Sequence, residues 1–354
     1  MSKYISFWNI GIISAFFFTT TYATTHVTHD NEVQTAIHTL QLQFGTETES
    51  WAKVCNQVKD LNPPVADQAR QFISPKCDSR SFYYGMGKPI DYVKARTCAY
   101  AERKSGSDET DNFSGSAILM MIYANGYGVK KNIALAERFA CVIPASEAEM
   151  EGRIKHLENL KNTSKQTSAF DLCDDITSGF MMGECAILGD DLNKPEREQK
   201  LAAIQKNWNQ REKSAFQRLK NAANHFTKIR SEEEIDLSGT ARTVFLIGEA
   251  NIQQRDFTES LKLLELNQAP HYSLAQFKDA DQKLNFLFQK LIHGNTLPQG
   301  TITQESVQKT QKAWIQYRDA WLAFAKIKYS QYSSESIAAW FTKKRNHMLD
   351  SLLN

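Results

Sequence analysis

The stretch that decides the fold is Trp314-Ile315-Gln316-Tyr317-Arg318-Asp319-Ala320-Trp321, in the last part of the chain. Its large aromatic residues recur at intervals of three and four, and Phe324 and Ile327 continue the series. This spacing places them on one face of an α-helix. We therefore predict a helix over about 304–329. No segment alternates convincingly at a period of two, so the sequence predicts an all-α protein in which short helical-hairpin repeats precede a long-helix bundle.

Other segments of the C-terminal half have similar apolar spacing, and each predicts a helix that packs one face into a core. Ser231 and Glu234 fit a capping box, which predicts that a helix begins near them. Ser333-Ser334-Glu335 is typical of the start of a last helix. The other predicted long helices are 195–230, 241–266 and 279–292.

The N-terminal residues have the layout of a secretory signal. Met1-Ser2-Lys3 precedes a mostly apolar run from Ile5 to Phe18, and small residues lead to Ala23. We predict a signal peptide over residues 1–23, with a membrane anchor as the less favoured alternative because the apolar run is short for a bilayer. The mature chain is then expected to lack a transmembrane segment and to be periplasmic or secreted.

Six cysteines in an exported chain predict three disulfide bonds. Six cysteines allow fifteen pairings, and the sequence does not choose among them. Our preferred hypothesis pairs consecutive cysteines, because each such bond would join two neighbouring helices. No two cysteines form a Cys-x-x-Cys motif, which disfavours a redox or zinc site. The candidates are Cys55, Cys77, Cys98, Cys141, Cys173 and Cys185.

A repeated pattern follows a short-helix lead-in over residues 24–79. Phe82 to Ala95 aligns with Tyr123 to Ala136, and the matching glycines Gly85 and Gly126 are 41 residues apart. The aromatic residue, the glycine turn and the Asp91 or Asn132 cap predict two helical hairpins. Residues 115–129 closely resemble a Sel-one-like repeat, a relative of the tetratricopeptide repeat, and we assign residues 80–160 to such repeats.

Three segments of the C-terminal half resemble the LprI-like lysozyme inhibitor family. They are Met182 to Ala186, Asp281 to Asn285 and Ala313 to Ala320, and residues 234–241 resemble a segment of its longer members. The chain departs from the family at Leu322, where many members have a cysteine. The resemblance implies a helical domain over residues 165–354 with lysozyme as the protein partner.

Composition and motifs disfavour several other functions. The formal net charge is only +2, whereas a nucleic-acid-binding protein needs a surplus of cations on one face. The sequence contains no His-Glu-x-x-His, no Gly-x-Ser-x-Gly and no glycine-rich phosphate loop. A glycosidase carboxylate pair needs no local motif, and nothing recommends one. We therefore predict a protein that is not an enzyme and that has no cofactor and no metal.

The candidate binding residues are charged. Glu232, Glu233, Glu234 and Asp236 form the best local acidic patch, which could meet a cationic lysozyme surface. Arg318 and Asp319 are adjacent, so on a helix they point about 100° apart, and we expect each to pair with a neighbouring helix.

The favoured hypothesis is an exported lysozyme inhibitor in which a rigid loop or helix end near residues 232–240 blocks a cleft. The alternative is a periplasmic scaffold that binds a peptide or protein through the groove of its repeats, residues 80–146. The two differ in which half of the chain contacts the partner.

Overall fold

The computed structural model describes residues 50–68, 77–106, 111–162, 168–294, 297 and 300–353. The predicted signal peptide and most of the lead-in lie outside these residues. The chain divides into two compact units, with the boundary after Asn56. The second unit, Gln57–Asn354, contains nearly all of the described helices. The described residues contain helices and no strand, which confirms the all-α prediction. None of their helices is long and apolar enough to cross a membrane.

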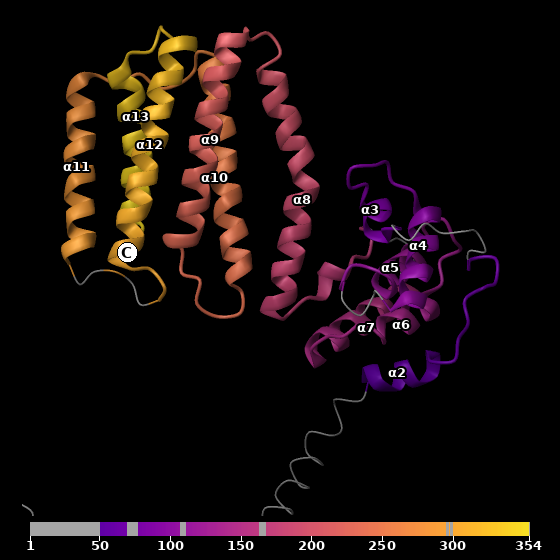
Figure 1. Ribbon diagram of the computed structural model, residues 1–354. Helices are drawn as coiled ribbons and strands as arrows, with labels where there is room; N and C mark the ends of the chain where they lie inside the picture. The colour runs from indigo at the N-terminus through magenta and orange to yellow at the C-terminus, as the bar shows by residue number, and fades with distance from the viewer. Residues whose placement is uncertain are drawn as a thin grey trace, which may run out of the picture. The chain divides into compact units, whose positions relative to one another are not determined.

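Short helices form the first part of this unit (Figure 1). The helix α5 is its centre, because every side chain from Ala117 to Ala124 is almost completely buried. Helices α3, α4 and α6 contact α5, and α7 contacts α6. The bounds are α2 (Ser50–Val58, which begins before the unit), α3 (Ser79–Tyr84), α4 (Tyr92–Ser105), α5 (Ser116–Asn125), α6 (Ile133–Ala140) and α7 (Glu147–Asn162).

The two aligned segments have the same local structure. The Asp91 carboxylate accepts a hydrogen bond from the Lys94 backbone N–H, and the Asn132 side chain does the same with Leu135. Asp91 N–H donates to the Phe82 carbonyl and Asn132 N–H to the Tyr123 carbonyl, each at 2.9 Å. The predicted caps are therefore confirmed, because both hairpins close with the same hydrogen bonds 41 residues apart.

The disulfide pairing corrects the consecutive scheme. Cys77 is bonded to Cys98, with 5.3 Å between their Cα atoms, so neither Cys55–Cys77 nor Cys98–Cys141 exists. The reason is the antiparallel α3–α4 hairpin, in which Ser79 N–H donates to the Glu102 carboxylate and so places Cys77 beside α4. The third consecutive pair, Cys173–Cys185, is confirmed. Cys55 and Cys141 are also disulfide-bonded, and no cysteine is free.

Six long helices form the second part. Helix α12 packs against α9 and α13, α11 packs against α13, and α8 packs against α10 (Figure 1). A short 3-10 helix, η2 (Leu172–Asp175), precedes them and is joined to the first turns of α8 by Cys173–Cys185. The bounds are α8 (Gly179–Ile204), α9 (Gln210–Glu233), α10 (Arg242–Glu265), α11 (Leu274–His293), α12 (Gln304–Lys328) and α13 (Ser334–Asp350).

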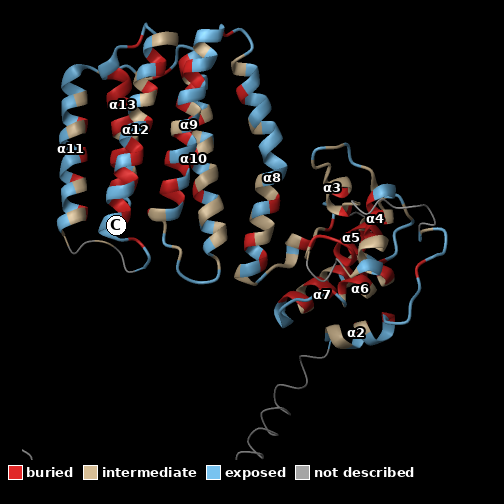
Figure 2. Ribbon diagram, in the orientation of Figure 1, coloured by how far each residue is buried: buried red, intermediate tan, exposed pale blue. Residues whose placement is uncertain are grey.

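The aromatic stripe of α12 is the centre of the bundle core. Trp314, Tyr317, Trp321 and Phe324 are all buried, as the sequence predicts. Trp321 stacks on Phe341 of α13 with ring centroids 4.7 Å apart. Figure 2 shows buried residues along α9, α12 and α13, whereas the outer helices α8 and α11 are mostly exposed. Burial of these large aromatic side chains contributes substantially to the apolar core of the bundle.

Two predicted helix boundaries are wrong. The predicted helix over 195–230 is divided, because α8 continues through the exposed Pro195 and ends at Ile204. Asn209 and Glu212 form a reciprocal capping box that begins α9. Ser231 does not begin a helix either, since it lies in the last turn of α9 and its hydroxyl donates to the Lys228 carbonyl.

Close packing between α8 and the segment that begins α10 depends on two glycines. A Cβ atom added at Gly179 would lie 2.4 Å from Thr240 Oγ1, and one added at Gly183 would lie 2.8 Å from Thr243 Cβ. Real Cβ atoms do not approach other atoms so closely, so a side chain at either position would separate the helices. Gly189, on the same helix, has open space where its Cβ would be.

The two glycines Gly183 and Gly189 should therefore respond oppositely to alanine. Gly183→Ala should destabilise the bundle by about 1–3 kcal/mol, because it overpacks a closed contact. Gly189→Ala should stabilise it by about 0.5–1 kcal/mol, because alanine has the higher helix propensity. Urea unfolding followed by tryptophan fluorescence measures both. Equal effects of the two substitutions would show that α8 does not pack on α10 in this way.

Candidate functional site

The predicted acidic patch is not one surface. Glu232 is exposed and lies 3.9 Å from Lys228 on the same helix. Glu233 forms an ion pair with Lys309 of α12. Glu234 is only 1% exposed and points into the bundle. Of these three residues, Glu232 alone presents a carboxylate that is not committed to another helix.

Glu234 is the centre of a buried ionic network, which corrects its assignment as a surface binding residue. The Arg345 guanidinium, which is 0% exposed, donates to both Glu234 oxygens at 2.6 Å. Arg345 Nε donates to Gln311 Oε1 at 2.9 Å. Two parallel hydrogen bonds to one carboxylate form the strongest geometry available to an arginine. The network thus joins the end of α9 to α12 and α13.

The same network extends to α10 and is neutral. Arg230 donates to Glu234 Oε2 at 2.7 Å and to Glu249 Oε1 at 2.5 Å, and Gln253 also donates to Glu249. Two arginines are therefore balanced by two glutamates. Buried charges are tolerated only when they are paired and hydrogen-bonded. Removal of one residue of the network would therefore leave its partner's charge unpaired in the low-dielectric core.

Asp236 lies in the α9–α10 connection and fixes its shape. Its carboxylate accepts hydrogen bonds from Ser238 N–H at 3.0 Å and Thr301 N–H at 3.2 Å. These hydrogen bonds, chiefly the one from Ser238 N–H, lower the pKa of the Asp236 carboxyl below its usual value, so it is ionised at neutral pH. Thr301 Oγ1 in turn accepts from Leu237 N–H at 2.8 Å. We call residues 235–241 the pinned loop.

Gly300 allows this close approach between two connections. A Cβ atom there would lie 2.6 Å from Asp236 Oδ1, and the φ angle of 143° is one that other residues rarely adopt. The pinned loop is therefore held against the α11–α12 connection by backbone geometry as well as by hydrogen bonds. Its tip, residues Ser238 to Thr240, is exposed.

Arg318 and Asp319 are not part of this surface, and their predicted pairing is wrong. Arg318 Nη2 lies 3.0 Å from Asp319 Oδ1, so the two residues pair with each other and not with neighbouring helices. The long arginine side chain can bend back over its own helix, where its guanidinium also lies over the Trp314 ring at 5.1 Å. Arg318 is nine residues beyond Lys309, or about 14 Å along α12. The structure therefore separates this pair from the residues of the predicted acidic patch.

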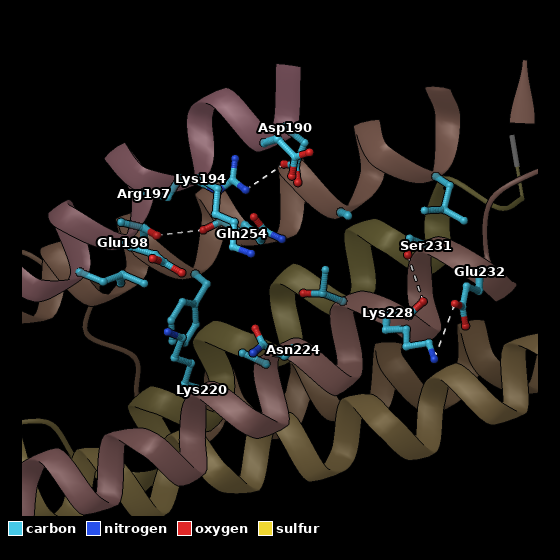
Figure 3. A pocket seen from close by; sticks show the side chains of 18 residues that line it. Asp190, Lys194, Arg197, Glu198, Lys220, Asn224, Lys228, Ser231, Glu232 and Gln254 are labelled. Atoms are coloured by element: carbon cyan, nitrogen blue, oxygen red, sulfur yellow. Dashed lines mark hydrogen bonds and ion pairs between the residues drawn. The ribbon is translucent and has the colours of Figure 1, made fainter. Parts of the chain in front are cut away.

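Sequence reasoning missed a groove between α8 and α9 whose floor is α10 (Figure 3). Its volume is about 490 Å³, within the range of small-molecule sites. We call it the three-helix groove. Leu201, Ala223, Leu246, Ala250 and Phe257 contribute its apolar surface, and charged residues line its walls. No local motif marks it, because its residues come from three helices and meet only through packing.

The charges of the groove are partly neutralised within it. Arg197 Nη2 lies 2.8 Å from Asp190 on the same helix, and Arg197 Nη1 donates to Asn251 of α10 at 3.3 Å. Glu232 of the predicted acidic patch lies at one end of the groove beside Lys228. The groove thus offers hydrogen-bonding and ionic groups above an apolar floor, which suits binding. No group of three or more potential metal ligands occurs among the described residues.

Comparison with known proteins gives one partial match. Residues 267–347 match the family model described as Lysozyme inhibitor LprI, which covers α11, α12 and most of α13. No curated protein and no solved structure matches the chain. The match confirms the resemblance for this part of the C-terminal half. The similar segments at 182–186 and 234–241 lie outside it, and the Sel-one-like repeats stay a prediction.

Glu234 and Glu233 are adjacent glutamates for which we expect very different costs of substitution. Glu234→Gln should destabilise the bundle by about 3–5 kcal/mol, because Arg345 and Arg230 would remain buried without a full counter-charge. Glu233→Gln should cost less than about 1 kcal/mol, because it removes only a partly exposed pair with Lys309. Urea unfolding measures both values. A similar small cost for each would contradict the buried network.

Proposed function

We propose that this chain is an exported protein that inhibits a lysozyme by binding it and obstructing its cleft. The observation that carries the proposal is the match of residues 267–347 to a family of lysozyme inhibitors. Two of the matched helices, α12 and α13, supply a large share of the buried core of the bundle, which suits a stiff binding protein. All six cysteines are disulfide-bonded. This supports export, since disulfide bonds persist in oxidising compartments.

The pinned loop is the proposed inhibitory element. The matched region supplies Thr301, which holds the loop, and Lys309 and Arg345, which pair with the two glutamates just before it. A loop that is already held in one conformation loses little conformational entropy on binding, so more of the contact energy appears as affinity. Its ionised Asp236 and the nearby exposed Glu232 give this end local negative charge toward a cationic enzyme.

Steric obstruction requires no chemistry from the inhibitor. The carboxylates of Glu233, Glu234 and Asp236 are held by hydrogen bonds or by counter-ions, which suits structural and recognition roles. We therefore assign binding, and not catalysis, to the pinned loop. Affinity would come from the fit of the loop tip, residues 238–240, in the partner's substrate cleft.

The direct test is a turbidity assay of bacterial cell-wall lysis with the purified, oxidised protein. Lysis by a stoichiometric amount of lysozyme should slow as the protein is added and should approach zero at molar excess. The slowing should disappear after reduction of the disulfides if these hold the active shape. Undiminished lysis at a large excess of oxidised protein would contradict the proposed function.

A second prediction tests the pinned loop itself. Thr301→Val removes the hydroxyl that accepts from Leu237 N–H, so the loop should loosen and inhibition should weaken about tenfold while the fold stays intact. Thr97→Val is the matched control, because the Thr97 hydroxyl donates only to the Val93 carbonyl of its own helix. Inhibition constants from the turbidity assay, with thermal unfolding as the folding check, distinguish them. Equal inhibition by both variants would remove the loop from the mechanism.

A further inference from the structure

Phe180, in the first turn of α8, presents its ring to solvent. It is 64% exposed, whereas Trp314, Trp321 and Phe324 of the same bundle are at most 2% exposed. Single apolar side chains are common at protein surfaces and need no function. What distinguishes Phe180 is its position beside the pinned loop.

The first turn of α8 touches the tip of the pinned loop. A Cβ atom added at Gly179 would lie 2.4 Å from Thr240 Oγ1 and 2.5 Å from the Thr240 carbonyl carbon, so the two backbones are in direct contact. Each helical residue turns the chain by about 100°, so Phe180 lies beside this contact and not within it. Residues 238–240 are exposed as well. Phe180 and the loop tip therefore form one continuous surface, which we call the loop–Phe180 surface.

The backbone that carries Phe180 is held on both sides. Before it, Thr177 N–H and Ser178 N–H donate to Glu149 Oε1 at 3.0 and 2.6 Å, and Ser178 caps α8 by accepting from Met181 N–H. After it, the Cys173–Cys185 disulfide joins the second turn of α8 to η2. A side chain on such a backbone loses mainly its own rotamer freedom on binding, which keeps the entropic cost of a contact low.

The loop tip alone offers a partner little apolar contact, because Ser238, Gly239 and Thr240 are small and mostly polar. Binding energy at protein interfaces is concentrated in a few large side chains, often aromatic, which polar contacts surround and shield from water. The cleft of a lysozyme keeps one of its catalytic carboxyls in a hydrophobic pocket, so it offers an apolar surface to a phenyl ring. The loop–Phe180 surface combines such a ring with a polar surround.

We propose that Phe180 is the apolar anchor of the inhibitory surface. Its ring enters an apolar part of the lysozyme cleft, and the loop tip contacts the polar groups around it. This inference rests on the proposed function and adds to it the side chain that supplies most of the affinity. The family model matches residues 267–347, so the anchor comes from a part of this chain outside the match.

Phe286 provides a matched control within the same bundle. It is 65% exposed, almost the same as Phe180, but it lies on α11. Figure 1 shows α8 and α11 at opposite edges of the bundle. Phe286 precedes the end of α11 by seven residues, or about 10 Å along the helix. Replacement of either ring by alanine removes an exposed phenyl group, and only one of the two rings lies on the loop–Phe180 surface.

Inhibition constants from the turbidity assay with the full-length oxidised protein test the anchor. Phe180→Ala should weaken inhibition about thirtyfold, a typical hot-spot loss, and Phe180→Trp should stay within about threefold of the parent. Phe286→Ala should inhibit as the parent does, and all variants should unfold at the parent's temperature. If the parent inhibits and Phe180→Ala inhibits equally well, this inference alone is overturned. A parent that does not slow lysis would overturn the proposed function as well.

Isothermal titration calorimetry of lysozyme binding gives a second readout. Burial of apolar surface on binding makes the heat-capacity change negative. The parent and Phe286→Ala should show the same negative change, and Phe180→Ala should show a smaller one. Weaker inhibition by Phe180→Ala with an unchanged heat-capacity change would mean that the ring is not buried in the complex, and would overturn the anchor.

Discussion

The bidentate contact between Arg345 and Glu234 is the constraint on which the rest of the bundle depends. These residues are 111 positions apart in the chain and both are completely buried at the side chain. A charge in the core must meet its partner in one geometry or pay a large desolvation cost. The contact therefore fixes the end of α9 against α13, and it fixes where the pinned loop leaves the bundle. Arg230 and Glu249 extend the same constraint to α10.

This constraint explains how a helical bundle can present a stiff loop. Helix ends and connections are usually the least stable parts of a domain. Here the connection after α9 begins at a buried ionic network and is held further along by Asp236, Thr301 and the close approach at Gly300. The aromatic face of α12 packs the helices that carry these anchors. The pinned loop and the three-helix groove lie at different places on the bundle of helices α8–α13.

The sequence predicts the elements of this fold better than their pairing. Trp314, Tyr317 and Trp321 define α12 because helical periodicity is a local signal. Asp91 and Asn132 predict their caps because capping is local as well. Glu234 looks like one of a run of surface acids, and only its distant partner Arg345 makes it a core residue. Cys98 pairs with Cys77 for a similar reason, since the pairing follows from how α3 and α4 fold back on each other. The groove is likewise a product of packing among three helices.

Amide hydrogen exchange of the full-length oxidised protein, with and without lysozyme, tests the central claim most directly. If the pinned loop enters the cleft, exchange should slow at the backbone N–H groups of residues 237–241, while the interior of α12 stays as protected as before. Unchanged exchange throughout the chain, or new protection confined to the helical hairpins of residues 80–146, would contradict this account.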